Sequence, residues 1–150
     1  MNTINPLKEK YYAMYMNIAV EASKQSVATR RQVGCVIVLP SGLLSVGFNG
    51  TPSGFDNNCE STWFSKEGYE VLKTKPEVIH AERNSLDKLS REGVSPLNSI
   101  LFTTTAPCME CAKSIHAVGI TTVYYLDSYN SETGINFLIK SGVKIDKFII

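Results

Sequence analysis

Apolar positions near the start of the chain follow a helical period. Four large apolar side chains recur at intervals of four, three and four residues: Leu7, Tyr11, Met14 and Ile18. This spacing places them on one face of a helix, and Pro6 is well suited to the entry of such a helix. We therefore expect an amphipathic helix that begins just after Pro6 and buries this stripe.

Further along the chain, short apolar runs alternate with helical patterns. We expect strands at 33–38 and 43–48 joined by a turn at 40–42, a helix at 80–91, a strand at 100–104, a helix at 108–118, a strand at 121–126, a helix at 132–140 and a strand at 143–150. The first two strands form a hairpin, whereas helices between later strands act as crossovers and imply parallel pairing. The pattern predicts an α/β fold: one domain over 1–150, with a mixed sheet and helices on both faces.

Residues 49–79 interrupt this pattern. The segment combines glycine, proline, asparagine and charged residues with little periodicity. We expect a loop, and a loop this long inside a compact domain is usually functional.

Composition excludes several classes of protein. A formal net charge of +1 gives no general attraction for a polyanion, so a nucleic-acid partner is disfavoured. No segment has the apolar length of a membrane span. Residues 1–6 lack the charged and apolar regions of a secretory signal. We expect a cytoplasmic location, which would be the host cytoplasm for a viral protein.

Two short motifs carry the chemistry. His80-Ala81-Glu82 and Pro107-Cys108-x-x-Cys111 together read H-A-E … P-C-x-x-C, a pattern typical of zinc-dependent nucleobase deaminases. One imidazole and two thiolates leave the fourth tetrahedral position of a zinc ion open for water, as in catalytic sites. Glu82 is then the carboxylate that moves protons. A structural zinc or a redox C-x-x-C would need neither the open position nor Glu82.

The remaining cysteines and histidine have plainer interpretations. Cys35 lies in an apolar run and is expected to be a buried small hydrophobe. Cys59 is expected to be an ordinary loop cysteine, with a second metal ligand as the alternative. His116 follows Cys111 by five positions and should project away from the two sulfurs, on the surface or satisfied in the core.

With these motifs, the chain from about residue 10 resembles the cytidine deaminase superfamily, and within it the deoxycytidylate (dCMP) deaminases. Segment 47–54, G-F-N-G-T-P-S-G, is similar to the G-[YF]-N-G-x-P-x-G segment of that group, and 32–38, Q-V-G-C-V-I-V, to its Q-V-G-A-x-I-V strand. The long insert before His80 is a further likeness. The resemblance implies a three-layer α/β/α sandwich around a five-stranded mixed sheet.

The resemblance also implies an activity and a site. The reaction would be hydrolysis of dCMP to dUMP and ammonia, which supplies dUMP for dTMP synthesis. One zinc ion per chain would be held by His80, Cys108 and Cys111, with Glu82 as proton shuttle. Substrate contacts would come from Asn49 to the deoxyribose, from the backbone near Thr105 and Ala106 to the cytosine, and from Tyr129 to the 5′-phosphate.

Regulation and assembly are implied in the same way. Family members are commonly hexamers, activated by dCTP and inhibited by dTTP with Mg²⁺. The resemblance also implies that Arg30, Arg31 and the Asn49-Gly50 loop contact the effector phosphates. Some viral members hold a second zinc through a cysteine pair before the first strand; here 26–29 reads S-V-A-T, so we expect one zinc only.

Three alternatives stay open at this point. A tRNA adenosine deaminase shares both half-motifs, but the net charge and segment 47–54 speak against it. A bifunctional dCMP/dCTP deaminase differs only in how it treats the triphosphate. A non-catalytic zinc module would have no need of Glu82.

Overall fold

The computed structural model describes residues 5–150. Residues 1–4, most of the segment in which we expect no secretory signal, lie outside this range. The elements are, in order, a 3₁₀ turn η1 (Glu9–Tyr11), α1 (Tyr12–Ser23), β1 (Gly34–Val38), β2 (Leu44–Phe48), β3 (Glu60–Phe64), β4 (Glu70–Thr74), α2 (Ala81–Glu92), β5 (Ile100–Thr105), α3 (Met109–Ala117), β6 (Thr122–Asp127), α4 (Thr133–Lys140) and β7 (Lys144–Lys147).

Five strands form one mixed sheet in the order β2-β1-β5-β6-β7. β1 pairs antiparallel with both β2 and β5, while β5, β6 and β7 pair in parallel. β5, β6 and β7 are parallel because a crossover helix connects each to the next. Each helix returns the chain to the end of the sheet at which the preceding strand began. The predicted mixed α/β sheet is confirmed.

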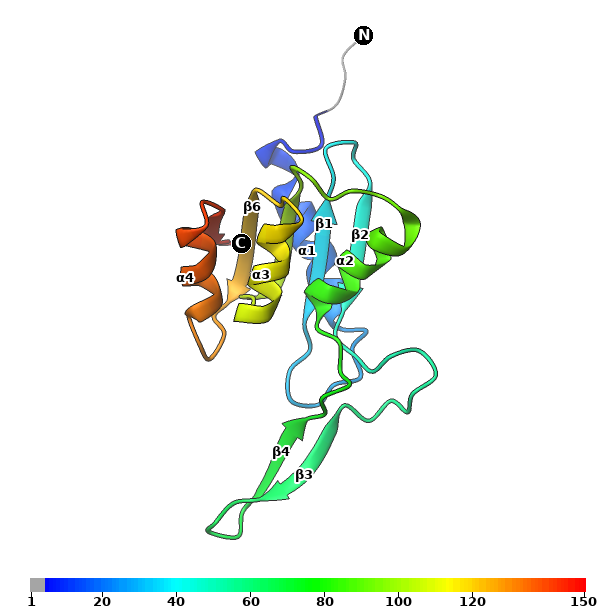
Figure 1. Ribbon diagram of the computed structural model, residues 1–150, viewed down its shortest axis with the longest axis vertical. Helices are drawn as coiled ribbons and strands as arrows, with labels where there is room; N and C mark the ends of the chain where they lie inside the picture. Colours follow the sequence, from blue (N-terminus) through cyan, green and yellow to red (C-terminus); the bar gives the residue numbers. More distant parts are fainter. Residues whose placement is uncertain (1–4) are drawn as a thin grey trace.

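The helices form two layers on opposite faces of the sheet (Figure 1). α1 covers one face, where Met16, Val36 and Phe102 are among the side chains of an apolar cluster. α2, α3 and α4 cover the other face, where the core includes Leu86, Ile115, Leu138 and strand residues pointing the other way. The predicted α/β/α sandwich is therefore confirmed.

The apolar stripe predicted for the first helix is partly wrong. Met14 is 49% exposed, and the buried positions are instead Tyr15, Met16, Ala19 and Ala22. Two of the four buried residues are alanines, and at Ala19 the helix and the sheet come very close: a Cβ on Gly34 would overlap the carbonyl oxygen of Ala19. A search for large apolar side chains overlooks alanines that permit such an approach. The other three predicted positions are partly buried against this cluster.

The loop predicted for 49–79 contains a hairpin. β3 and β4 pair antiparallel and project away from the sandwich (Figure 1). Because neither face of the hairpin is covered, its sequence lacks the alternation of a half-buried strand. Its aromatic residues are exposed, with Phe64 and Tyr69 at 74% and 72%. In the sequence, the hairpin is indicated only by side chains of high strand propensity on either side of the turn at Gly68.

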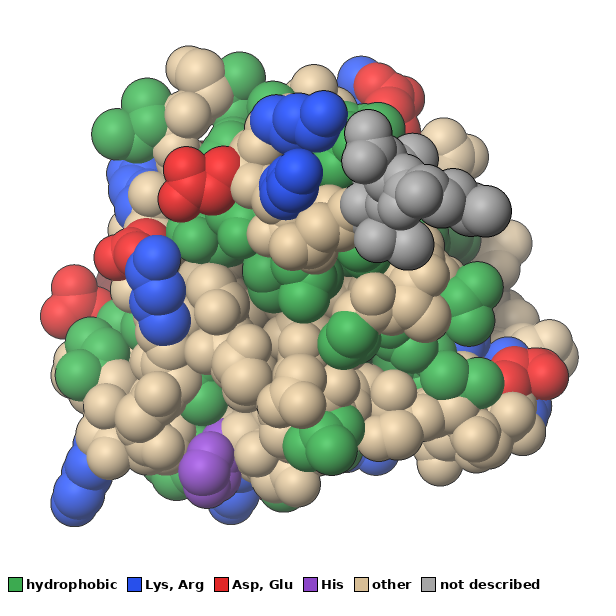
Figure 2. All heavy atoms as spheres, turned by 90° about the horizontal axis from the view of Figure 1, so that it is seen from above, with side chains coloured by type: hydrophobic (Ala, Val, Ile, Leu, Met, Phe, Trp, Pro, Cys, Tyr) green, Lys and Arg blue, Asp and Glu red, His purple; other side chains and the backbone are tan. Residues whose placement is uncertain are grey.

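The surface carries charges of both signs. On the face shown in Figure 2, the described Lys and Arg side chains lie among Asp and Glu, and neither kind forms a continuous field. Within residues 5–150, no helix is both long and apolar enough to cross a bilayer.

Candidate zinc and nucleotide site

The two metal-binding half-motifs lie at the starts of two helices. His80 is the N-cap of α2 and Cys108 the N-cap of α3, both in extended backbone conformation. The His80 carbonyl accepts the N–H of Asn84, and the Cys108 carbonyl accepts that of Ala112, each at 2.9 Å. Both side chains therefore lie at the positive ends of helices, where a thiolate is stabilised.

His80, Cys108 and Cys111 converge on one point. Their ligand atoms lie within 4.8 Å of one another, and His80 Nδ1 is 3.5 Å from the Cys108 sulfur and 3.4 Å from the Cys111 sulfur. Among residues 5–150 this is the one group of three or more candidate ligands. Two sulfurs and one imidazole nitrogen are donors that zinc prefers, so the residues present fit a zinc ion.

The two thiols differ in acidity. Hydrogen bonding from Cys111 lowers the pKa of Cys108 to about 4, with a further contribution from His80 and against the effect of burial. The pKa of Cys111 is raised, first by its hydrogen bond to Cys108 and then by burial. The hydrogen bond between the two sulfurs favours loss of one proton from the pair, and a bound cation would compensate the charge of a second thiolate.

Glu82 lies behind the metal ligands. It is the second residue of α2 and is almost fully buried. Burial raises the pKa of its carboxyl group, which brings the group toward the range in which it can both take and give a proton. Its Oε1 lies 3.5 Å from the hydroxyl of Thr103 in β5.

Two glycines allow neighbouring elements to come close to the helices that carry the ligands: Gly47 of β2 lies against α2, and Gly134 of α4 lies against the start of α3. A Cβ on Gly47 of β2 would meet the Ala81 carbonyl and Ser85 of α2. A Cβ on Gly134 of α4 would overlap the carbonyl oxygen of Pro107, beside Cys108. The positions of both half-motifs therefore depend on these contacts.

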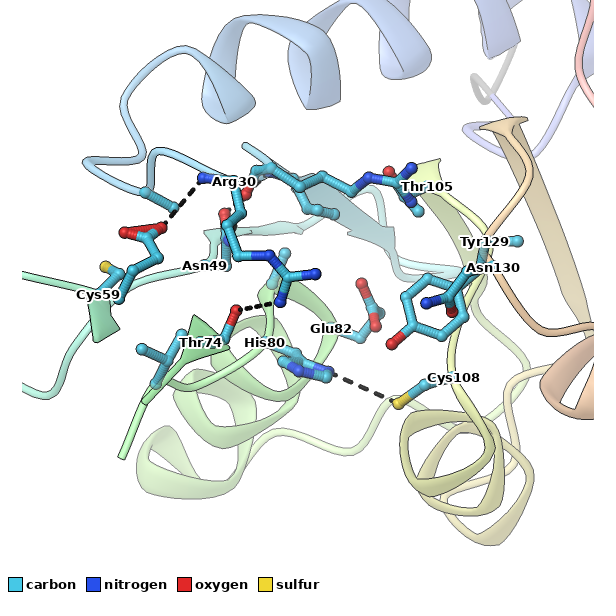
Figure 3. Close-up of a pocket in the computed structure, with 17 residues that line it drawn as sticks. Arg30, Asn49, Cys59, Thr74, His80, Glu82, Thr105, Cys108, Tyr129 and Asn130 are labelled. Carbon is cyan, nitrogen blue, oxygen red and sulfur yellow. Dashed lines mark hydrogen bonds between the residues drawn. The ribbon is translucent and has the colours of Figure 1, made fainter. Parts of the chain in front are cut away.

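One cavity of about 410 Å³ joins two of the predicted metal ligands, His80 and Cys108, to most of the predicted nucleotide contacts, while the third ligand, Cys111, is buried and does not line it (Figure 3). This volume lies within the range of small-molecule sites. The predicted residues that line it are His80, Glu82, Cys108, Asn49, Thr105, Ala106, Tyr129, Arg30 and Arg31. Residues predicted for the substrate and for the effector thus share one cavity.

Asn49 and Gly50, both predicted as site residues, form hydrogen bonds with the backbone of other segments. Asn49 Oδ1 accepts the N–H of Val33 at 2.8 Å, and its Nδ2 donates to the Arg31 carbonyl at 2.8 Å. One amide hydrogen and one lone pair are left for a ligand. Gly50 exchanges backbone hydrogen bonds with Ile79 and is not among the residues that line the cavity.

Cys35, Cys59 and His116 lie apart from the metal ligands. Cys35 is fully buried in β1, as predicted. Cys59 is buried and lines the cavity, with its sulfur 3.8 Å from the Asn57 carbonyl. His116 is exposed, and its ring packs edge-on against Phe137.

Glu60, Thr74 and Thr103 were missed by the sequence analysis. Glu60 and Thr74 line the cavity from the hairpin. Thr103 lies beside Glu82 inside β5. Nothing in the sequence marks Glu60, which follows a loop cysteine, or Thr103, which lies in an apolar strand, as a site residue. Only the fold brings them to the site.

Comparisons with known proteins identify the family to which the chain belongs. Residues 9–127 match the family described as the cytidine and deoxycytidylate deaminase zinc-binding region. The deoxycytidylate deaminase of Schizosaccharomyces pombe is 33% identical over 153 residues, and that of Saccharomyces cerevisiae is 30% identical over 149. These matches cover 97% and 95% of this chain but 46% of each yeast protein. The chain thus spans about half the length of these relatives.

A solved structure matches over almost its full length. The dCMP deaminase of cyanophage S-TIM5, in complex with dCMP and dUMP, superposes with a TM-score of 0.83 at 37% sequence identity. The match covers 95% of this chain and 99% of the phage chain. Fold, ligand cluster and sequence agree, and this chain belongs to the cytidine and deoxycytidylate deaminase family.

Proposed function

We propose that this protein is a dCMP deaminase, which hydrolyses dCMP to dUMP and ammonia and supplies dUMP for dTMP synthesis. The observation that carries the proposal is the single cavity in which His80 and Cys108 of the His-Cys-Cys cluster and a buried glutamate lie with two arginines and a tyrosine. The first group suits hydrolysis of an amidine, and the second suits an anionic nucleotide. The S-TIM5 structure, with dCMP and dUMP bound, supports the same substrate class.

His80, Cys108 and Cys111 would hold one zinc ion per chain. When bound, the ion would supply a Lewis acid that makes a water molecule nucleophilic at neutral pH. The chain's own contribution is to hold three donors at one point beside the cytosine site and to exclude other water by burial. Mg²⁺ is proposed only as a companion of a nucleotide effector.

Glu82 would carry the protons of the reaction. Water adds to C4 of the cytosine ring, and Glu82 takes a proton from it and delivers it to N3. Glu82 then transfers the proton of the new C4 hydroxyl group to the exocyclic amino group, the C4–N bond breaks, and ammonia leaves as the C4 carbonyl forms. A carboxyl group whose pKa is raised by burial is suited to this repeated exchange.

Nucleotide recognition would use the opposite side of the cavity. Asn49 keeps donor and acceptor capacity for the deoxyribose, the backbone near Thr105 and Ala106 would contact the base, and Tyr129 would donate to the 5′-phosphate. Arg30 and Arg31 line the same cavity. We therefore assign them to the substrate phosphate as well as to the proposed effectors, and their loss should lower basal turnover.

Regulation and assembly are proposed from the family resemblance. dCTP would activate, dTTP with Mg²⁺ would inhibit, and the protein would form a homo-hexamer in the cytoplasm. Sigmoidal dCMP saturation that becomes hyperbolic with dCTP would support regulation. Light scattering would test the hexamer.

The function is tested by ammonia release from dCMP, dCTP, CMP and deoxycytidine, with a gel-shift on tRNA beside it. Preference for dCMP supports the proposal. Comparable rates on dCTP would indicate the bifunctional enzyme, and tRNA binding with no release from any pyrimidine would favour the adenosine deaminase. Zinc binding without turnover, in wild type and Glu82→Gln alike, would indicate a non-catalytic module.

A further inference from the structure

The β3–β4 hairpin joins the nucleotide cavity through its first and last residues. Glu60 and Thr74 pair across the root of the hairpin, and both line the cavity. The strands between them extend away from the sandwich (Figure 1). β3 and β4 pack mainly against each other rather than against another helix or strand, and a two-stranded hairpin has little stability of its own, so its placement depends on contacts at this root.

Glu60 is a buried carboxylate whose partners are backbone groups. It is 6% exposed, and its Oε1 accepts the N–H of Thr29 at 2.7 Å and that of Arg30 at 3.1 Å. Among the ion pairs within residues 5–150, none involves Glu60. A buried charge is tolerated only when it is hydrogen-bonded, so these two bonds tie the segment before β1 firmly to the hairpin.

Glu60 binds the backbone N–H of Arg30, and Thr74 binds its side chain. Arg30 Nη1 donates to the Thr74 hydroxyl at 3.3 Å. In the view of Figure 3, the Arg30 guanidinium lies between Thr74 and Glu82. A guanidinium has five N–H donors, so several stay available to a ligand.

We propose that Glu60 and Thr74 are positioning residues, through which the hairpin root presents Arg30 to the 5′-phosphate of the substrate. The inference rests on the function proposed above. Arginine binds phosphate through directional, charge-assisted hydrogen bonds, and their strength depends on where the guanidinium is held. Neither positioning residue touches the reacting atoms. Their loss should therefore weaken a nucleotide substrate and spare a nucleoside.

The test compares dCMP with deoxycytidine on the zinc-loaded enzyme. Glu60→Ala should raise KM for dCMP about tenfold, the effect of losing hydrogen bonds to a charged group, and leave kcat/KM for deoxycytidine within about twofold. Glu60→Gln keeps an acceptor oxygen and should restore most of the affinity for dCMP. Thr74→Val should give a smaller effect of the same kind. Glu70→Ala is the matched control, since Glu70 is an exposed acid on the same hairpin.

A double-mutant cycle identifies Arg30 as the link. In an Arg30→Ala background, Glu60→Ala should no longer change KM for dCMP, because the two residues act as one unit. An undiminished effect there, or equal losses on dCMP and deoxycytidine, would overturn the positioning role. If wild type releases no ammonia from either substrate, the proposed function fails instead. Calorimetric binding of dCMP and deoxycytidine to the same variants then decides the positioning role by the same comparison.

Discussion

The zinc end of the cavity and the β3–β4 hairpin differ in how they are supported. His80 and Cys108 begin helices that pack on the sheet, and Glu82 between them is buried. The hairpin is exposed on both faces and is linked to the body at its root. Under the proposed function, the chemistry would lie on helices packed against the sheet, whereas substrate selection would depend in part on a projecting insert.

The largest expected effect is loss of a metal ligand. Cys108→Ser and Cys111→Ser should each lose zinc and activity together, because a neutral hydroxyl is a poor replacement for a thiolate. Metal analysis and ammonia release on the same preparation check this. Cys59→Ser, outside the ligand cluster, should keep its zinc. Full zinc occupancy in either ligand variant would show that the ligands are misassigned.

Glu82→Gln should fold, retain zinc and bind dCMP, yet lose about 10²–10⁴-fold in kcat, the usual contribution of a general acid–base. Steady-state kinetics with metal analysis checks it. Glu110→Gln is the control, because Glu110 lies in the first turn of α3 but is exposed and pairs with Lys113. Near wild-type turnover by Glu82→Gln would remove the residue from the mechanism.

Tyr129→Phe should weaken dCMP more than deoxycytidine. The lost hydroxyl would cost about 1.5–3 kcal/mol in transition-state stabilisation, as hydrogen bonds to charged groups do. The measurement is kcat/KM for the two substrates. Equal effects on both would mean that Tyr129 does not contact the phosphate.

Gly134→Ala tests the support of Cys108 from α4. Alanine favours a helix by about 1 kcal/mol over glycine, but its Cβ would overlap the Pro107 carbonyl. We expect a net loss of about 1–3 kcal/mol in the free energy of unfolding, with weaker zinc binding, measured by denaturation and metal competition. Asn136→Ala, at an exposed position of α4, should change neither. A stabilised Gly134→Ala variant would contradict the close approach.

The smallest effect is expected at the far end of the hairpin. Phe64→Ser changes a residue that is 74% exposed and lies away from the root. Zinc content and kcat on dCMP should stay within about twofold of wild type. A large loss of zinc would show that the hairpin supports the metal site, and the contrast between the two regions would not hold.

Prediction from sequence succeeded where the signal is local, as in a short β-branched run or a glycine at a helix end. β1, buried at every position, and the glycine that ends α2 were both recognisable. Met14 failed because the buried face of α1 is formed by its neighbours Tyr15 and Met16 and by two alanines, Ala19 and Ala22. The hairpin failed because uncovered strands carry no alternation. The His-Cys-Cys cluster was predictable because its two motifs are short and local in sequence, whereas the role proposed for Glu60 depends on Arg30, thirty residues earlier in the chain.

The central claim is that metal chemistry and phosphate recognition share one cavity. The most direct measurement is kcat/KM of the zinc-loaded protein for dCMP and for deoxycytidine, by ammonia release. The account predicts a preference for dCMP of at least about tenfold, since one well-placed charged hydrogen bond contributes that much. Equal values for the two substrates, or no ammonia from either, would contradict it.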